Sequence, residues 1–495
     1  MAIDKVTTGV IADDAVTTAK IVNDAVTAGK IVVGAVVADV ANDSITAAHL
    51  ADGAIDHADK IASGVVTNVK LGADAVDGTK MADNAVNSEH VAAGAIDTAH
   101  VGNDQITGAK IENNPTIAGN LAVTGNTTVT GDIVPSTPLS YRNVVINGGM
   151  TVAQRGNGAG TATGGSGFYQ TADRMFDFNN CVAANVTRET TNGVLGTEAT
   201  NTFNDVFRYS WKWASNGTVA SLPSADRVIF IYKMEGQDVQ HLAKGTSAAK
   251  AVTLSFWVKS TLTGNHQVII TDNINTRQIG AVYAISAANT WEKKVITFAG
   301  DTTGAITNDI TNGMSIEWWL TAGSTYSSGA VPTSWEASAA GDRAVAQQNY
   351  VGGSGRTWQI TGIQLELGSN ATPFEHRSFG DELVKCMRYY EKTNNYDRKP
   401  GTSGGDQAQG MMVYREGYSG SARRDISVNF KVNKRALPTM KGYAPNGTAD
   451  KVNSPNGPNT TNVVFDDIGN SGCVMYAQPT SGSYWQGHWT AISEL

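Results

Sequence analysis

The chain has 495 residues, of which 41% are hydrophobic, and its 37 Lys plus Arg against 45 Asp plus Glu give a net charge of −8. That length allows three or four folded units, and the acidic balance argues against nucleic acid as a partner because no basic face can neutralise phosphates. No apolar stretch approaches the ~20 residues of a membrane span, and three widely spaced cysteines indicate neither a disulfide framework nor a metal site.

The first 111 residues carry a large aliphatic side chain at almost every fifth position. The series begins with Val6, Ile11 and Val16 and runs, with two slips of one residue, to Ile111. The residues between the aliphatics repeat over ten positions, as in DAVTTAKIVN, which is typical of an array. With a five-residue period, neither a helix nor a strand would keep these side chains on one face. The chain must therefore turn within each repeat.

The energetics of this array favour association. Ordering five residues costs roughly 5–10 kcal/mol of backbone entropy, whereas burying one Val or Ile returns roughly 1.5–3 kcal/mol. One chain alone would stay open, but several chains wound around a shared apolar seam would not. We therefore predict that residues 1–114 form the shaft of a parallel homotrimer. The alternative is a disordered low-complexity arm, which the low hydrophobicity and acidity also favour.

The composition changes sharply near position 141. All 37 aromatic residues and every Arg lie at or after Tyr141. Residues 1–140 carry 7 Lys against 17 Asp plus Glu, a net charge of −10, and the remaining residues have a net charge of +2. Between these parts, glycines six residues apart follow the first proline, Pro115. We predict a short β-helical or β-prism collar and linker over residues 115–140.

Residues 141–377 have the pattern of an all-β domain. Val252, Leu254 and Phe256 alternate with other side chains, as expected when one strand face is buried, and similar rows recur along the domain. We predict a jelly-roll-like β-sandwich, with a bulge where a row changes phase at Gly362. The alternation directs Trp257 and Trp319 away from the core, where their rings could stack on a sugar. Packing at an interface or at the edge of the core is the alternative for each of them.

Residues 378–495 are predicted to form a hinge helix and a small β-rich tip. Ser378 followed by Asp381 resembles a helix cap, so a helix of about three turns begins there. Glu375, His376 and Arg377, just before it, are interpreted as an ion-pair network in preference to a catalytic cluster. Near the end, SYWQGHW gathers four candidate receptor-binding residues: Tyr484, Trp485, His488 and Trp489.

Several segments carry a family resemblance, among them the DAVTTAKI-type decapeptides and the GNLAVTGNTTVTGD run, which are similar to phage fibre shafts. ATPFEHRSFGDELVKCMRYYEK (residues 371–392), NVVINGGMTVAQRG (143–156) and FKVNKRALPTM (430–440) resemble blocks of phage tail fibre and tail-associated receptor-binding proteins. The resemblance implies a trimeric fibre whose head is similar to a carbohydrate-binding β-sandwich and binds glycans on a bacterial surface. It identifies no sugar-contacting residue.

These observations lead to one functional prediction. The chain is a structural virion protein, a non-enzymatic tail fibre that binds a bacterial surface receptor and needs no cofactor or metal. Its first repeats would attach to the phage tail or to an adaptor protein, with assembly in the host cytoplasm because the amino terminus lacks a secretory signal. Two alternatives are a tail spike that degrades polysaccharide and a bacterial trimeric surface adhesin.

Overall fold

The computed structural model describes residues 141–156, 160–162, 166–182, 184–190, 206–396, 398–402, 409–416, 421–480 and 483–495, together with eleven isolated residues before position 96. The predicted shaft (1–114) and collar (115–140) lie outside the described residues, apart from those eleven positions. They stay predictions, as does the homotrimer.

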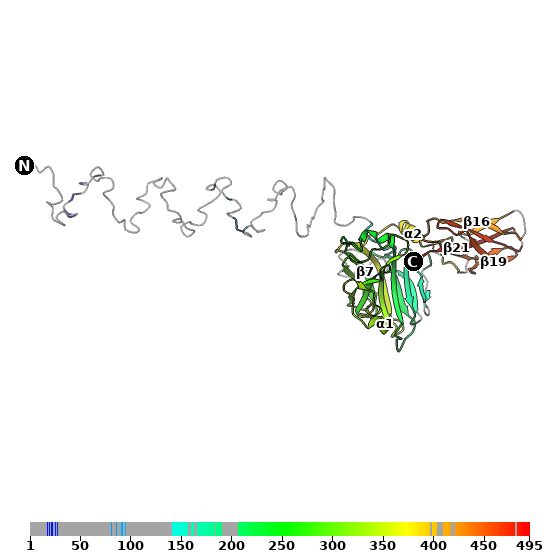
Figure 1. The fold of residues 1–495 in the computed structure, drawn as a ribbon, viewed down its shortest axis with the longest axis horizontal. Coiled ribbons are helices and arrows are strands. Elements are labelled where there is room, and N and C mark those ends of the chain that lie inside the picture. The colour runs from blue at the N-terminus through cyan, green and yellow to red at the C-terminus, as the bar shows by residue number, and fades with distance from the viewer. Residues whose placement is uncertain are drawn as a thin grey trace, which may run out of the picture. The chain divides into compact units, whose positions relative to one another are not determined.

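The first two sheets of the described chain form a sandwich (Figure 1). One has six strands in the order β1 (Gly160–Ala162), β4 (Ala184–Thr190), β5 (Tyr209–Ser215), β13 (Thr357–Leu367), β7 (Val252–Ser260) and β10 (Glu292–Phe298). The other has seven strands in the order β12 (Glu336–Ala337), β9 (Arg277–Ile285), β8 (Gly264–Asp272), β11 (Asn312–Ala322), β6 (Arg227–Glu235), β3 (Met175–Asn179) and β2 (Ser166–Tyr169). Four short helices connect strands: η9 (Gly236–Leu242), α1 (Ser324–Ser327), η10 (Ala340–Asp342) and α2 (Phe379–Met387).

An aromatic core holds the two sheets together. Trp211 of β5 and Phe230 of β6 lie on facing sheets with their ring centroids 4.4 Å apart, and Trp318 of β11 contacts Phe256 of β7 at 5.5 Å. All four side chains are buried. The strand alternation predicted the inward position of Phe256, and the all-β fold class is confirmed.

Gly362 interrupts the pairing of β13 with β7. The register shifts between Thr361 and Gln364, and Gly362 has a φ of 62°, a conformation in which a Cβ is strained. The bulge brings Ile363 back to the core side, where it is fully buried. The predicted bulge is confirmed, and it keeps both halves of a long strand in one core.

The predicted helix cap is also confirmed. Ser378 is the N-cap of α2, and its hydroxyl accepts a hydrogen bond from the backbone N–H of Asp381 at 3.1 Å. Asp381 and Glu382 lie in the first turn, where the helix dipole favours negative charge. None of the helices in the described part of the chain is long and apolar enough to cross a membrane.

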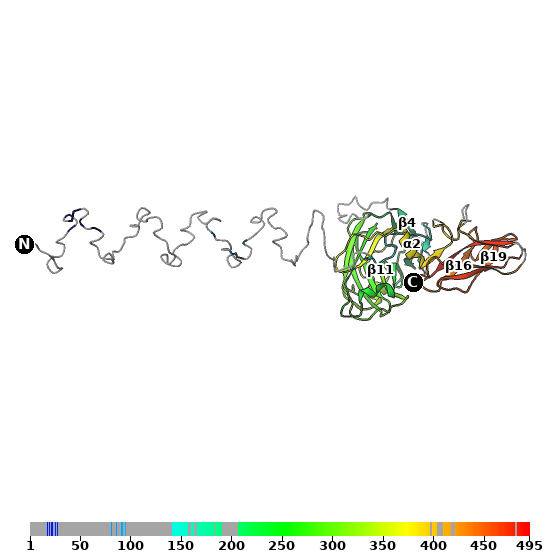
Figure 2. The same cartoon turned by 90° about the horizontal axis from the view of Figure 1, so that it is seen from above.

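The chain after α2 forms a third sheet, drawn mainly in orange and red in Figures 1 and 2, which we call the tip. Its strands are β14 (Tyr390–Lys392), β21 (Tyr484–Ile492), β18 (Lys451–Ser454), β19 (Gly457–Asp466), β20 (Gly472–Ala477) and β16 (Arg424–Asn429), with β15 (Met412–Arg415) and β17 (Thr439–Tyr443) also paired to β21. A separate apolar core that includes Trp485 and Trp489 supports it.

Buried charged groups join the tip to the sandwich. The guanidinium of Arg388 donates two hydrogen bonds of 2.8 Å to the carboxylate of Glu235 on β6. Arg174, next to β3, is paired with Glu494 at 2.7 Å. Because these groups are largely withdrawn from water, removing one partner would leave a buried charge, so the network fixes the tip against the sandwich.

Candidate functional site

The two sandwich tryptophans proposed for sugar contact are buried. Trp257 is 0% exposed and Trp319 is 2% exposed, so the prediction that they present open rings to solvent is wrong. The alternation did place them on the faces turned away from the main core. Those faces are covered by other segments: Phe207 packs on Trp257, and Tyr326 lies 5.2 Å from the ring of Trp319.

The aromatic cluster near the end of the chain is also largely internal. Trp485, His488 and Trp489 are buried, and only Tyr484 is half-buried. The indole N–H of Trp485 donates to the backbone oxygen of Arg424 at 3.1 Å. These residues lie on β21, and because the side chains of Trp485, His488 and Trp489 are buried, they build the tip instead of presenting an open contact surface.

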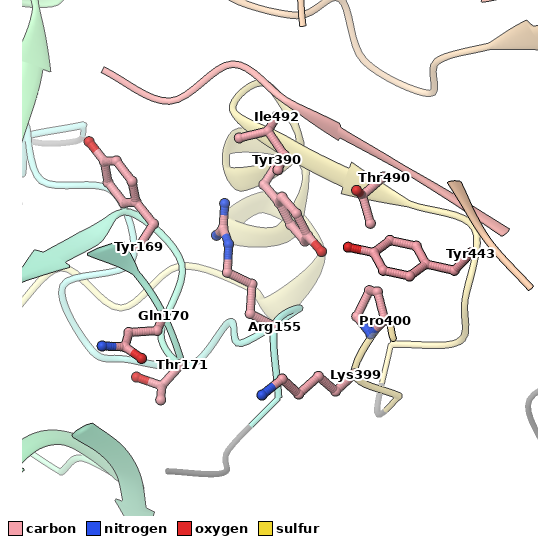
Figure 3. Close-up of a pocket in the computed structure, with 10 residues that line it drawn as sticks. All are labelled: Arg155, Tyr169, Gln170, Thr171, Tyr390, Lys399, Pro400, Tyr443, Thr490 and Ile492. Atoms are coloured by element: carbon pink, nitrogen blue, oxygen red, sulfur yellow. The ribbon is translucent and has the colours of Figure 1, made fainter. Parts of the chain in front are cut away.

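The structure instead brings other residues together in a cavity of about 230 Å³ where the sandwich meets the tip (Figure 3). We call it the junction pocket. Its walls come from the turn before β1, from the end of β2, from β14 and the loop after it, from β17 and from β21. Ten residues line it: Arg155, Tyr169, Gln170, Thr171, Tyr390, Lys399, Pro400, Tyr443, Thr490 and Ile492.

The strand register of the tip positions one wall of the junction pocket. Tyr390 of β14 lies opposite Ile492 of β21, and Lys441 of β17 lies opposite Thr490 on the same strand. Tyr443 is the last residue of β17, two positions after Lys441, so the side chains of Tyr443 and Lys441 lie on the same face of the sheet. Figure 3 shows the hydroxyl groups of Tyr390 and Tyr443 directed toward one another.

Arg155 forms the charged floor of the pocket. Its guanidinium lies 3.7 Å from the centroid of the Tyr390 ring and pairs with Glu494 at 2.9 Å and with Asp173 at 3.4 Å. Burial alone would lower the pKa of Arg155, but the negative charges of Glu494 and Asp173 outweigh it and raise that pKa above its ordinary value. Arg155 is therefore a fixed cation, held by neighbours that lie behind the pocket lining.

The three tyrosines present rings with hydroxyl groups at their polar ends. The hydroxyl of Tyr169 donates to the backbone oxygen of Leu495 at 2.7 Å. Burial raises the pKa of Tyr169, Tyr390 and Tyr443 above the ordinary value, so all three phenols stay protonated at neutral pH. Such groups offer both an apolar face and a hydrogen-bonding group to a ligand.

Lys399 lies at the mouth of the pocket. It is exposed, and within the described residues no ion pair to it is found. The backbone of Gly156 approaches it closely: at a φ of 88°, a Cβ on Gly156 would lie 3.3 Å from Cβ of Lys399. A glycine at this turn therefore lets the lysine stem lie against the pocket wall.

The remaining wall comes from the loop after β2. Thr171 is 2% exposed and has a φ of 60°, which is rare for a β-branched residue, and its buried hydroxyl has no hydrogen-bond partner among the described residues. The side-chain amide of Gln170 donates to the buried carboxylate of Asp177 at 3.1 Å. Burial raises the pKa of Asp177 to about 7.

The charged residues before α2 serve the fold. Arg377 pairs with Glu375 at 2.9 Å and with Glu382 at 3.1 Å, and Glu375 also accepts the backbone N–H of Asn143 at 2.9 Å. These contacts tie the first described segment to the helix. The interpretation of this group as an ion-pair network is confirmed.

No sequence family and no curated protein matches the chain. Solved structures with partial similarity include the enzymatically active domain of bacteriophage CBA120 tailspike protein 4, with 13% identity over 46% of this chain and 22% of that chain, at a TM-score of 0.24. Another is a family 11 carbohydrate-binding module from Clostridium thermocellum in complex with a mixed-linked tetrasaccharide, with 14% identity over 41% of this chain and 91% of the module, at a TM-score of 0.20. A third is the amino-terminal cellulose-binding domain of a Cellulomonas fimi glucanase, with 11% identity over 33% of this chain and 79% of that domain, at a TM-score of 0.18. Likeness at this level carries no argument about function.

No pattern in the sequence indicates the junction pocket as a unit. Arg155, Tyr169, Tyr390 and Tyr443 lie in four separate segments, and each is an ordinary aromatic or charged residue in its local context. Only the pairing of β14 and β17 with the same strand brings the last two together.

Proposed function

We propose that the chain is a non-enzymatic receptor-binding fibre protein of a phage virion, and that its head binds a bacterial surface saccharide in the junction pocket. The observation that carries the proposal is the pocket lining: three tyrosine rings lie beside hydroxyl and amide groups in a cavity large enough for about one sugar unit. Aromatic rings stack on the apolar faces of sugars, and the polar groups provide hydrogen bonds to their hydroxyls.

The charge of the lining favours a saccharide that carries an acidic group. The ten lining residues include two cations, Arg155 and Lys399, and no carboxylate. Arg155 is already paired with acids behind the wall, so the exposed ammonium of Lys399 is the cation best placed to meet a carboxylate or phosphate on the ligand.

The same lining supports binding in preference to hydrolysis. Glycosidases use two carboxyl groups that flank the scissile bond. Three acids are bonded to lining residues from behind: Asp173 and Glu494 to Arg155, and Asp177 to Gln170, and none of them lines the pocket. Incubating the full chain with capsular polysaccharide of the host tests this part: steady release of reducing ends would contradict a non-enzymatic role.

Glycan binding by the full chain tests the site. We expect Tyr443→Ala to weaken binding of acidic host polysaccharide at least tenfold, because it removes one ring of the pocket, and Lys399→Ala to weaken it and reduce its salt dependence. Tyr141→Ala and Lys250→Ala are matched controls, since both residues are exposed and lie outside the junction pocket. Equal binding by all four variants would rule out the junction pocket.

The virion role depends on the repeats before position 114. A fibre shaft predicts that the native protein has three times the mass of the 52.0 kDa chain, and that antibodies to the head label purified virions. A monomeric protein in solution would contradict the trimeric shaft. The proposed saccharide site does not depend on the shaft and would be tested separately.

A further inference from the structure

We propose that the tip carries a second saccharide site, distinct from the junction pocket, which takes an uncharged sugar. Its location is a groove of about 530 Å³ over β19 and β20, on strands that contribute nothing to the junction pocket. We call it the tip groove.

The chemistry of the tip groove differs from that of the junction pocket. Nine residues line it, and none of them is charged. Six contribute an amide or an aliphatic hydroxyl: Asn456, Thr460, Thr461, Asn462, Gln478 and Thr480. A dense set of neutral donors and acceptors matches a ligand rich in hydroxyl groups, whereas an ionised ligand would find no opposite charge in the lining.

The strand register directs the two most useful amides to the same face. Val464 of β19 pairs with Tyr476 of β20. The last pair of this ladder is Val463 with Ala477. Because side chains alternate, Asn462 and Gln478, each one residue beyond that pair, are directed to the same face as Val464 and Tyr476, and all four line the groove. The two amides and the Val464–Tyr476 pair therefore form one continuous strip along the groove.

Each of these amides keeps one hydrogen-bonding group available. The side-chain oxygen of Asn462 accepts from Lys451, and the side-chain nitrogen of Gln478 donates to the backbone oxygen of Ser421 at 2.9 Å. In the described part of the chain, no hydrogen bond engages the nitrogen of Asn462 or the side-chain oxygen of Gln478. One donor and one acceptor thus remain within the same groove lining, which is the combination that neighbouring sugar hydroxyls require.

An apolar contact completes the strip. Val464 is 39% exposed and lies beside the half-buried ring of Tyr476. The guanidinium of Arg423 lies 3.6 Å from the centroid of that ring and is paired with Asp425 at 2.6 Å and with Asp466 at 3.0 Å. Arg423 therefore holds the ring in place while its own charge is neutralised by acids outside the groove lining.

The test uses the full chain and uncharged hexasaccharides of glucose, galactose and mannose as probes, with oligogalacturonate as the acidic probe. We expect at least one uncharged probe to bind, and Asn462→Ala and Gln478→Ala each to weaken that binding at least tenfold. Asn433→Ala is the matched control, because it removes an exposed tip amide outside the groove. Tyr443→Ala should leave this binding unchanged, which separates the tip groove from the junction pocket.

Three results would overturn the proposal. The first is that none of the uncharged probes binds the native chain. The second is that binding survives unchanged in both Asn462→Ala and Gln478→Ala. The third is that these variants alter the oligomeric mass instead of the affinity, which would make the groove a contact between copies of the chain. Circular dichroism of each variant confirms that the tip remains folded, and Asn462→Gln offers a second, less disruptive change at the same position.

Discussion

The guanidinium of Arg155 lies 3.7 Å from the centroid of the Tyr390 ring, so a sandwich residue and a tip residue share one contact at the floor of the junction pocket. The same guanidinium bonds Glu494, which in turn pairs with Arg174 at 2.7 Å. The proposed binding site and the junction between sandwich and tip are therefore built from the same side chains, and changes to one should affect the other.

Replacing Arg155 tests the strength of this junction. Arg155→Gln leaves the buried carboxylates of Asp173 and Glu494 with one cation fewer, so we expect a loss of about 3 kcal/mol in the free energy of unfolding. Urea denaturation followed by tryptophan fluorescence measures it. The control is Lys212→Met, which breaks a half-buried pair with Glu189, more open to solvent than the Arg155 contacts, and should cost less than about 1 kcal/mol. Equal losses in the two variants would show that burial does not strengthen the Arg155 contacts.

The sequence predicted the parts of the fold that depend on neighbouring residues. The alternation around Phe256 predicted the core face of its strand, the change of phase predicted the bulge at Gly362, and Ser378 with Asp381 predicted the start of α2. Each of these features is encoded within a few residues, where the periods of strand and helix and the chemistry of caps apply.

The parts that failed depend on contacts between distant segments. Alternation correctly turned Trp319 away from the main core, but it could not indicate that the segment containing Tyr326 and Ala344 covers that face. Likewise, Arg155 and Tyr390 are brought together by the docking of the tip on the sandwich. No local pattern encodes such a contact, so the junction pocket could not be predicted from the sequence.

Gly362 offers a test of the bulge. A Cβ at this position would lie 2.5 Å from the ring of Phe207, and the φ of 62° already strains any L side chain. We expect Gly362→Ala to destabilise the chain by about 2–4 kcal/mol, from overpacking and backbone strain together. Gly380→Ala is the matched control: it lies on α2 with only Ser378 Oγ nearby, at 3.9 Å, and should stabilise by up to about 1 kcal/mol. If Gly362→Ala left the free energy of unfolding unchanged, the bulge would have to accommodate the added Cβ without strain.

The buried carboxyl group of Asp177 should make stability depend on pH. Its pKa in the folded chain is about 7, raised by burial from the ordinary 3.8, so the folded state binds a proton that the unfolded state releases between these values. The contribution of Asp177 to stability is therefore fully present below pH 4, falls as the pH rises toward 7, and stays low above it.

Asp177→Asn should remove this dependence. At pH 8 we expect the variant to be more stable than the native chain by up to about 4 kcal/mol, with a difference that shrinks as the pH falls to 5. Thermal melts at pH 5, 6.5 and 8 measure it. Asp309→Asn is the control, because hydrogen bonds from Thr311 lower the pKa of this exposed residue, and its titration lies below the tested range. Parallel curves for the native chain and Asp177→Asn would show that Asp177 does not titrate near 7.

Variants of Trp485 distinguish a structural role of this residue from a role in receptor contact. The residue is fully buried in the tip core, stacked against Tyr414 with ring centroids 6.4 Å apart, so Trp485→Ala should cost about 3–5 kcal/mol and loosen the tip. Trp485→Phe keeps most of the buried ring while losing the hydrogen bond to the oxygen of Arg424, and we expect it to stay folded with a smaller loss. Saccharide binding measured on Trp485→Phe then decides between the roles. Native affinity is expected, because the indole has no open face, whereas a folded Trp485→Phe protein with at least tenfold weaker binding would restore this residue as a direct contact.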